Sequence, residues 1–126
     1  MSKGDCLFAA PKYIPREMER LEKDFLRKYT PLQRGTDKDK LSEIISKVHG
    51  QFEIIHPFRE GNGRVGRLIA ELIAIQAGYP SLDYERLGER YIDAMKIFCF
   101  NGDLGPLKIV FREAIELGIK EARNLT

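Results

Sequence analysis

The sequence predicts an all-α fold, and three observations carry that prediction. Apolar residues recur at three- and four-residue steps along five separate stretches, as they do on the buried face of a helix. Short segments rich in glycine, proline and asparagine separate these stretches, as connections do in a helical bundle. The length of 126 residues suits one domain, which we place at residues 1–126.

The elements are expected in the following order. Residues 1–15 are interrupted by Pro11 and Pro15, and within them Cys6–Ala10 is expected to form a strand or one arm of a hairpin. A first helix is expected from near Pro15 to Tyr29, because proline suits a first helical turn. Four more are expected at about 39–55, 63–77, 84–100 and 107–122. The 63–77 helix is apolar over most of its surface, which favours a place in the middle of the bundle.

The composition points to no special environment. With 21 basic and 19 acidic residues the net charge is +2, which gives no reason to propose a nucleic-acid or a membrane partner. No stretch approaches the roughly 20 apolar residues of a membrane span, and the N-terminus lacks the apolar run of a signal peptide. A cytoplasmic protein is therefore expected. Cys6 and Cys99 are far apart and form no CxxC pair, so free thiols are expected.

One segment concentrates the chemistry: residues 56–67 read HPFREGNGRVGR. Gly61, Asn62 and Gly63 fall where a loop is expected to become a helix. The first amides of a helix have no intrahelical partner and attract anions, and glycines let a phosphate approach the backbone. Asn62 can add a side-chain donor. The segment is not a P-loop, since GxxxxGK[ST] is absent.

The charged residues of this segment fit a chain of phosphates. Arg64 and Arg67 lie three residues apart, which places two guanidinium groups close together on a helix. Glu60 would be repelled by phosphates unless a Mg²⁺ ion stood between them. His56 can accept a proton from a hydroxyl near neutral pH, whereas His49, on the 39–55 helix, is expected to have a packing or surface role. Each feature alone is ordinary; together they indicate a phosphate-binding, nucleotide-using site.

Residues His56–Arg67 resemble the signature of Fic proteins, HxFx[D/E]GNGRxxR, and every fixed position is matched. The resemblance implies a Fic-fold helical bundle and a protein adenylyltransferase, which transfers AMP from ATP to a Ser, Thr or Tyr hydroxyl of a target protein and releases pyrophosphate. It implies ATP and Mg²⁺ as the small molecules used. It also implies that residues 1–15 form a β-hairpin flap beside the site that aligns the target's backbone.

The resemblance assigns roles to single residues. His56 would be the general base, and Glu60 would coordinate Mg²⁺. Phe58 would pack into the core and hold the loop. The ATP would be bound by the anion hole and two arginines, with Tyr91 near the adenine; these residues are Gly61, Asn62, Gly63, Arg64, Arg67 and Tyr91.

One departure from the family concerns regulation. Many Fic proteins carry a Ser/Thr-x-x-x-Glu-Gly/Asn helix whose Glu pairs with the second motif arginine. Here Ser81–Glu85 has the spacing, but Arg86 follows where Gly or Asn is expected. The resemblance therefore predicts a separate antitoxin-like protein, or a segment beyond this sequence, as the inhibitor that contacts Arg67.

Two other functions remain open at this point. Some relatives transfer phosphate or phosphocholine in place of AMP, although the phosphate-transferring ones lack the Gly-Asn-Gly pattern found here. The domain could also bind nucleotide without turnover, as an interaction module. The target protein is open as well: the family offers topoisomerase-like subunits for toxins and host GTPases for effectors secreted into a host cell.

Overall fold

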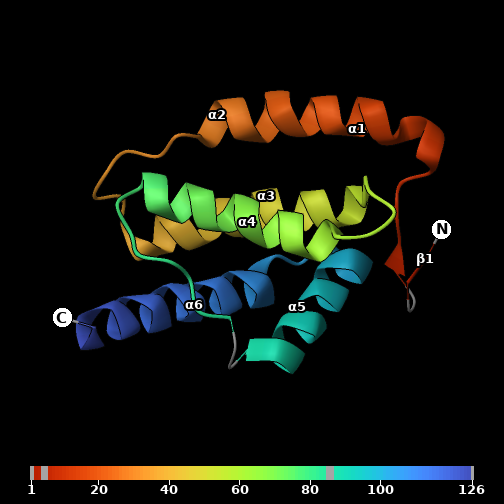
Figure 1. The fold of residues 1–126 in the computed structure, drawn as a ribbon. Helices are drawn as coiled ribbons and strands as arrows, with labels where there is room; N and C mark the ends of the chain where they lie inside the picture. The colour runs from red at the N-terminus through yellow and green to blue at the C-terminus, as the bar shows by residue number, and fades with distance from the viewer. Residues whose placement is uncertain (1, 4–5, 85–86, 126) are drawn as a thin grey trace.

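Helix α3, Lys38–Ile55, lies at the centre of the molecule. The computed structural model describes residues 2–3, 6–84 and 87–125. Around α3 are packed α4 (Asn62–Gln76), α6 (Gly105–Asn124), α5 (Gly88–Asn101) and the N-terminal helical segment (Figure 1). The all-α class expected from the sequence is confirmed.

The residues of α3 explain why it is central. Small side chains at Ser42, Ser46 and Gly50 let neighbouring helices approach, and these three residues are buried. A Cβ atom at Gly50 would lie 2.7 Å from the Phe98 ring of α5, so glycine is what allows this contact. The remaining buried residues of α3 are apolar apart from His49 and point to several sides of the helix: Leu41, Ile44, Ile45, Val48, Phe52 and Ile55.

Helix α4 does not lie in the middle of the bundle, so that expectation was wrong. Leu68, Leu72 and Ile75 are 54%, 50% and 46% exposed and lie along one side of the helix. The opposite side, with Ala70, Ile73 and Ala74, is buried and belongs to the same apolar core as α3. The apolar content of α4 alone does not show which sides of the helix are packed against other helices.

The first helical segment begins earlier than predicted. A 3₁₀ turn, η1, covers Pro11–Tyr13 and leads into α1, Ile14–Leu21. Pro11 suits this start because the first N–H of a helix needs no partner. A π-helical turn, η2 (Glu22–Leu26), and α2 (Arg27–Tyr29) complete the segment, which ends before Thr30 as predicted.

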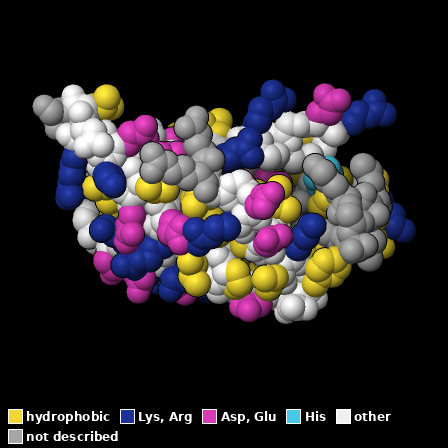
Figure 2. Space-filling model, turned by 90° about the horizontal axis from the view of Figure 1, so that it is seen from below, with side chains coloured by type: hydrophobic (Ala, Val, Ile, Leu, Met, Phe, Trp, Pro, Cys, Tyr) yellow, Lys and Arg dark blue, Asp and Glu magenta, His cyan; other side chains and the backbone are white. Residues whose placement is uncertain are grey.

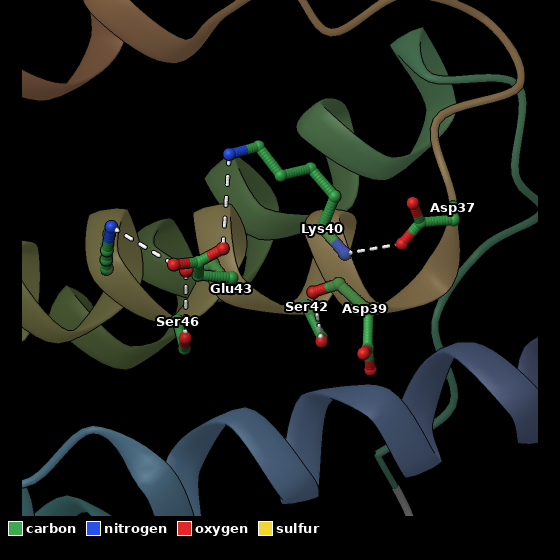
Figure 3. A network of polar contacts seen from close by, with 7 residues as sticks. Asp37, Asp39, Lys40, Ser42, Glu43 and Ser46 are labelled. Carbon is green, nitrogen blue, oxygen red and sulfur yellow. Dashed lines mark hydrogen bonds and ion pairs between the residues drawn. The ribbon is translucent and has the colours of Figure 1, made fainter.

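The start of α3 is fixed by local polar contacts (Figure 3). Asp37 Oδ1 accepts a hydrogen bond from the Lys40 backbone N–H at 2.8 Å, which satisfies one of the unpaired donors of the first turn. The hydroxyls of Ser42 and Ser46 donate hydrogen bonds to the backbone oxygens of the residues three positions earlier, at 2.9 and 3.0 Å. Asp39 also accepts from Arg112, which ties this end of α3 to α6.

Residues 81–84 have no regular secondary structure and α5 begins at Gly88, later than the predicted start near Tyr84. The Asp83 N–H donates to the backbone oxygen of Ala114 on α6 at 3.2 Å. A Cβ at Gly118 of α6 would lie 2.1 Å from the Ser81 backbone oxygen, so glycine allows the segment to lie directly on α6. Residues 85 and 86, which bear on the Ser81–Glu85 spacing, are outside the described residues.

Two short strands lie at the N-terminus: β1, Ser2–Lys3, and β2, Cys6–Leu7. They pair antiparallel, with Ser2 opposite Leu7, and β2 packs beside α5.

Cys99 of α5 is disulfide-bonded, so the prediction of free thiols was wrong. The side chain of Cys6 is outside the described residues. No local spacing in the sequence indicates that a strand of residues 1–15 lies next to α5.

One face of the molecule agrees with the balanced composition. The face in Figure 2 carries acidic and basic side chains scattered among apolar ones, and neither sign of charge dominates it. Among the described residues, no helix is both long and apolar enough to cross a membrane.

Candidate nucleotide-binding site

A cavity of about 530 Å³ opens where α3 ends and α4 begins. It brings together seven of the predicted site residues, together with Phe8, Glu53 and Arg59. The seven are His56, Glu60, Gly61, Asn62, Gly63, Arg67 and Tyr91. Arg64 is not among the described residues that line it.

His56 ends α3 in an unusual backbone conformation. Its φ of 51° is left-handed, and among the described residues it is the one non-glycine residue with a positive φ. Its N–H still donates to the Phe52 oxygen at 3.0 Å. A non-glycine residue in this conformation is strained, and such strain is concentrated at functional sites. The backbone here turns sharply, and the imidazole lines the cavity.

The N-terminus of α4 forms the other wall. Gly61 precedes the helix with a φ of 83°, which glycine adopts without strain, and its carbonyl accepts the Val65 N–H at 3.0 Å. The N–H groups of the first helical residues, Asn62, Gly63 and Arg64, have no intrahelical acceptor. Their partial positive charge and the helix dipole make this end of α4 an anion site.

The side chain of Asn62 has a different role from the one predicted. It is 4% exposed and makes two hydrogen bonds with the backbone of Phe58. Asn62 Nδ2 donates to the Phe58 oxygen at 2.7 Å, and the Phe58 N–H donates to Asn62 Oδ1 at 2.9 Å. The side chain of Asn62 thus holds the loop of residues 58–62 together, and the backbone amide of Asn62 is the group that faces the anion site.

Phe58 is not packed into the core, so that expectation was also wrong. Its side chain is 48% exposed, with its ring centroid 6.4 Å from that of Phe52. The loop is held by the hydrogen bonds between the Phe58 backbone and the Asn62 side chain.

Both motif arginines fold back over glycines. A Cβ at Gly63 would lie 3.2 Å from Arg67 Nη1, and one at Gly61 would lie 3.2 Å from Arg64 Nη2. The glycines therefore leave room for two guanidinium groups beside the free amides. Arg67 is half-buried and lines the cavity, whereas Arg64 is exposed. The two arginines therefore lie in different environments, although their spacing in the sequence predicted a similar position for both.

Glu60 is the exposed carboxylate at the rim of the cavity. Among the described residues, no group of three or more His, Cys, Asp and Glu side chains is placed to hold a metal ion. Mg²⁺ in nucleotide sites is held by one or two carboxylates together with phosphate oxygens and water. The residues present fit a magnesium ion of that kind, and Glu60 is the carboxylate that could hold it.

Sequence reasoning missed a polar cluster behind the cavity. His49 is fully buried, and its Nε2 lies 2.5 Å from the Tyr91 hydroxyl oxygen and 3.9 Å from Glu53 Oε1. Burial lowers the pKa of His49 to about 4 and raises the pKa of Tyr91. A Cβ at Gly66 would lie 2.2 Å from Glu53 Oε1, so α4 packs directly on this carboxylate. The spacing of His49 and Glu53, four residues apart, was the signal available.

These features define a class of site, in which a helix N-terminus and an arginine suited to an anionic ligand lie next to an imidazole and a carboxylate. The family model described as the Fic/DOC family matches residues 1–74, which include the whole 56–67 segment. The chain belongs to the Fic/DOC family.

Relatives of this chain carry names that are consistent with this family. The chain is 38% identical over 114 residues to "Probable protein adenylyltransferase y4lH" of Sinorhizobium fredii, covering 90% of this chain and 58% of that protein. It is 35% identical over 107 residues to "Protein adenylyltransferase" of Bartonella henselae, covering 84% of this chain and 19% of that protein.

Solved structures share the fold. The BepC protein of Bartonella tribocorum, with bound AMPPNP, superposes with a TM-score of 0.78 at 29% identity, covering 90% of this chain and 54% of that one. The N-terminal Fic domain of a VirB-translocated Bep effector of Bartonella quintana, with bound ADP, gives a TM-score of 0.78 at 30% identity, covering 90% and 52%. The chain thus spans about half the length of these proteins and of the S. fredii relative.

Proposed function

We propose that this chain transfers AMP from ATP to a Ser, Thr or Tyr hydroxyl of a target protein and releases pyrophosphate. The observation that carries the proposal is that the imidazole of His56 and the amide-lined start of α4 face one cavity. The names of the relatives and the adenine nucleotides bound in the BepC and B. quintana structures support it.

The triphosphate would lie across the N-terminus of α4. The amides of residues 61–64 and the guanidinium group of Arg67 would neutralise its charge, with Arg64 reaching from the exposed side. Glu60 would hold Mg²⁺ against the phosphates, and the metal would supply neutralisation of the charge that moves to the leaving group. Tyr91 would form the wall beside the nucleoside.

In the chemical step, His56 takes the proton from the target hydroxyl while that oxygen attacks the α-phosphorus. The new oxygen–phosphorus bond forms as the bond between the α-phosphorus and the bridging oxygen to the β-phosphate breaks. Pyrophosphate leaves with the electron pair of that bond, and AMP remains on the target. Positioning and charge neutralisation supply most of the acceleration in such transfers.

Two binding partners follow from the same proposal. The β1–β2 hairpin would be the flap that aligns an extended target segment by adding a strand. Arg67, half-buried in the cavity, would be the contact of an inhibitory glutamate from an antitoxin-like protein or from a segment beyond this sequence.

Labelled ATP tests the proposal. The chain is incubated with cell lysate and Mg²⁺, and with ATP labelled either at the α- or at the γ-phosphate. Compared with lysate lacking the chain, AMP transfer predicts additional protein-bound label from the α-position alone, and a matched reaction with His56→Ala should lose this label while still binding ATP. Mass spectrometry of the labelled band then identifies the modified residue.

The other outcomes separate the alternatives. Additional protein-bound label from the γ-phosphate alone, beyond that of lysate without the chain, would mean phosphate transfer. ATP binding without label in lysates from several sources would mean a nucleotide-binding module. Either result would contradict AMP transfer.

A further inference from the structure

The ring of Phe8 is stacked on the imidazole of His56. The ring centroids are 4.0 Å apart and the planes are inclined by 7°, which is a face-to-face contact. Phe8 follows strand β2 directly and is half-buried. Phe8 comes from the N-terminal segment and His56 from the end of α3, in the middle of the sequence, so the contact joins that segment to the candidate base.

The position of Phe8 is fixed from the backbone side. The N–H of Ala9 donates to the Ile54 oxygen, in the last turn of α3, at 3.2 Å. Phe8 lines the nucleotide cavity and also a second cavity of about 310 Å³ on the side of α1, whose lining includes Ala9 and Tyr13. Its ring is therefore part of the wall between the two cavities.

His56 depends on such a contact more than an ordinary helical residue would. Its left-handed backbone, with a φ of 51°, points the side chain out of α3 and into the cavity. A side chain at a helix end is free to rotate unless neighbours restrict it. A parallel ring on one face restricts rotation of the imidazole and shields that face from water.

We propose that Phe8 is a positioning residue that holds the His56 imidazole in place for proton transfer from the target hydroxyl. The proposal rests on the proposed function, in which His56 is the base. Phe8 acts through His56 and makes no bond to the reacting atoms.

The first test is spectroscopic and needs no substrate. The sequence contains two histidines, so an untagged sample labelled in histidine gives two imidazole Cε1–Hε1 signals, which His56→Ala assigns. A proton above an aromatic face is shifted upfield by the ring current. We expect the His56 signal to move downfield in Phe8→Leu and to return toward its wild-type position in Phe8→Tyr. The signal of His49, which contacts Phe111 and Tyr91, should stay in place.

The second test measures AMP transfer by the same variants. Phe8→Leu should lower kcat by roughly 10- to 100-fold, the loss expected for a displaced catalytic group, while KM for ATP is unchanged. Phe8→Tyr should recover most of kcat. The matched control is Tyr13→Leu, which removes an aromatic ring from the same segment on the side of the second cavity and should change neither reading.

The outcomes separate the two proposals. An unchanged His56 signal in Phe8→Leu would overturn the inference whatever the transfer assay shows. A moved signal with unchanged kcat would overturn it as well, since the stack would then not matter for transfer. A wild-type chain that binds ATP but labels no target would contradict the proposed function, while the spectra would still decide whether Phe8 holds the imidazole.

Discussion

The hydroxyl of Tyr91 on α5 and Nε2 of the fully buried His49 on α3 are 2.5 Å apart. This hydrogen bond lies directly behind the cavity, because Tyr91 is also one of its lining residues. The ring that would stand beside the nucleoside is therefore held in place from the core of the bundle.

Tyr91→Phe keeps this ring and removes the hydrogen bond. The buried nitrogen of His49 then lacks its partner, so we expect the free energy of unfolding to fall by about 1–3 kcal/mol. ATP affinity should change little. Tyr84→Phe is the matched control: the Tyr84 ring also packs against Phe111, but its buried hydroxyl has no hydrogen-bond partner among the described residues. Urea denaturation of both variants measures the difference, and equal losses would contradict the role given to the bond.

The buried His49 predicts a dependence of stability on pH. Its pKa is about 4 in the folded chain and near 6.5 when exposed, chiefly because burial disfavours the charged form. Between these values the unfolded chain binds the extra proton, so the free energy of unfolding falls as the pH is lowered. The contribution is at most about 1.4 kcal/mol per pH unit. Urea midpoints from pH 7 to pH 4 should show this slope, and His49→Gln should reduce it; an equal slope in that variant would contradict the assignment.

Gly66 is predicted to tolerate no side chain. A Cβ there would lie 2.2 Å from Glu53 Oε1 and 3.1 Å from His49 Cε1. Gly66→Ala should therefore lower stability by about 1–3 kcal/mol, as overpacking does, and weaken ATP binding because Glu53 lines the cavity. In Gly88→Ala, on α5, the new Cβ would meet no atom of the described residues within 4 Å, and the change should be neutral or stabilising by up to about 1 kcal/mol. Thermal unfolding and calorimetric titration with ATP check both effects.

Glu60 is predicted to act only through a metal ion. With Mg²⁺ present, Glu60→Ala should weaken ATP binding by about tenfold or more, since it removes the one carboxylate assigned to the ion. Without Mg²⁺ the variant should bind ATP as well as the wild type or better, because a negative charge next to the phosphates is gone. Glu121→Ala, an exposed acid near the C-terminal end of α6, is the control. Isothermal titration measures the ATP affinity of the wild type and of both variants. A loss of affinity in Glu60→Ala that is equal with and without Mg²⁺ would refute the assignment.

The sequence predicted the helices and the short motif well, because both depend on local pattern. The apolar spacing of α3 and the prolines near α1 and α6 are local signals, and the segment 56–67 holds most of the cavity's polar groups. The exposure of Leu68 on α4 and the bonded state of Cys99 depend on neighbours from elsewhere in the chain. No local pattern reports those neighbours.

The same distinction explains what was missed at the site. Phe8 reaches His56 through the arrangement of the N-terminal segment beside α3, which no spacing in the sequence encodes. The side-chain amide of Asn62 is of a type that donates hydrogen bonds to phosphates, yet in the structure it donates to the backbone oxygen of Phe58. Residue type predicted the chemistry of the site, whereas the partner of each polar atom required the structure.

The most direct test of the account is a crystal structure of this chain with Mg²⁺ and a non-hydrolysable ATP analogue. We predict that the phosphates lie against the amides at the N-terminus of α4, beside Arg67, with a nitrogen of His56 directed at the side from which the α-phosphorus is attacked. A triphosphate bound away from this helix end, or an imidazole directed away from the α-phosphorus, would contradict it.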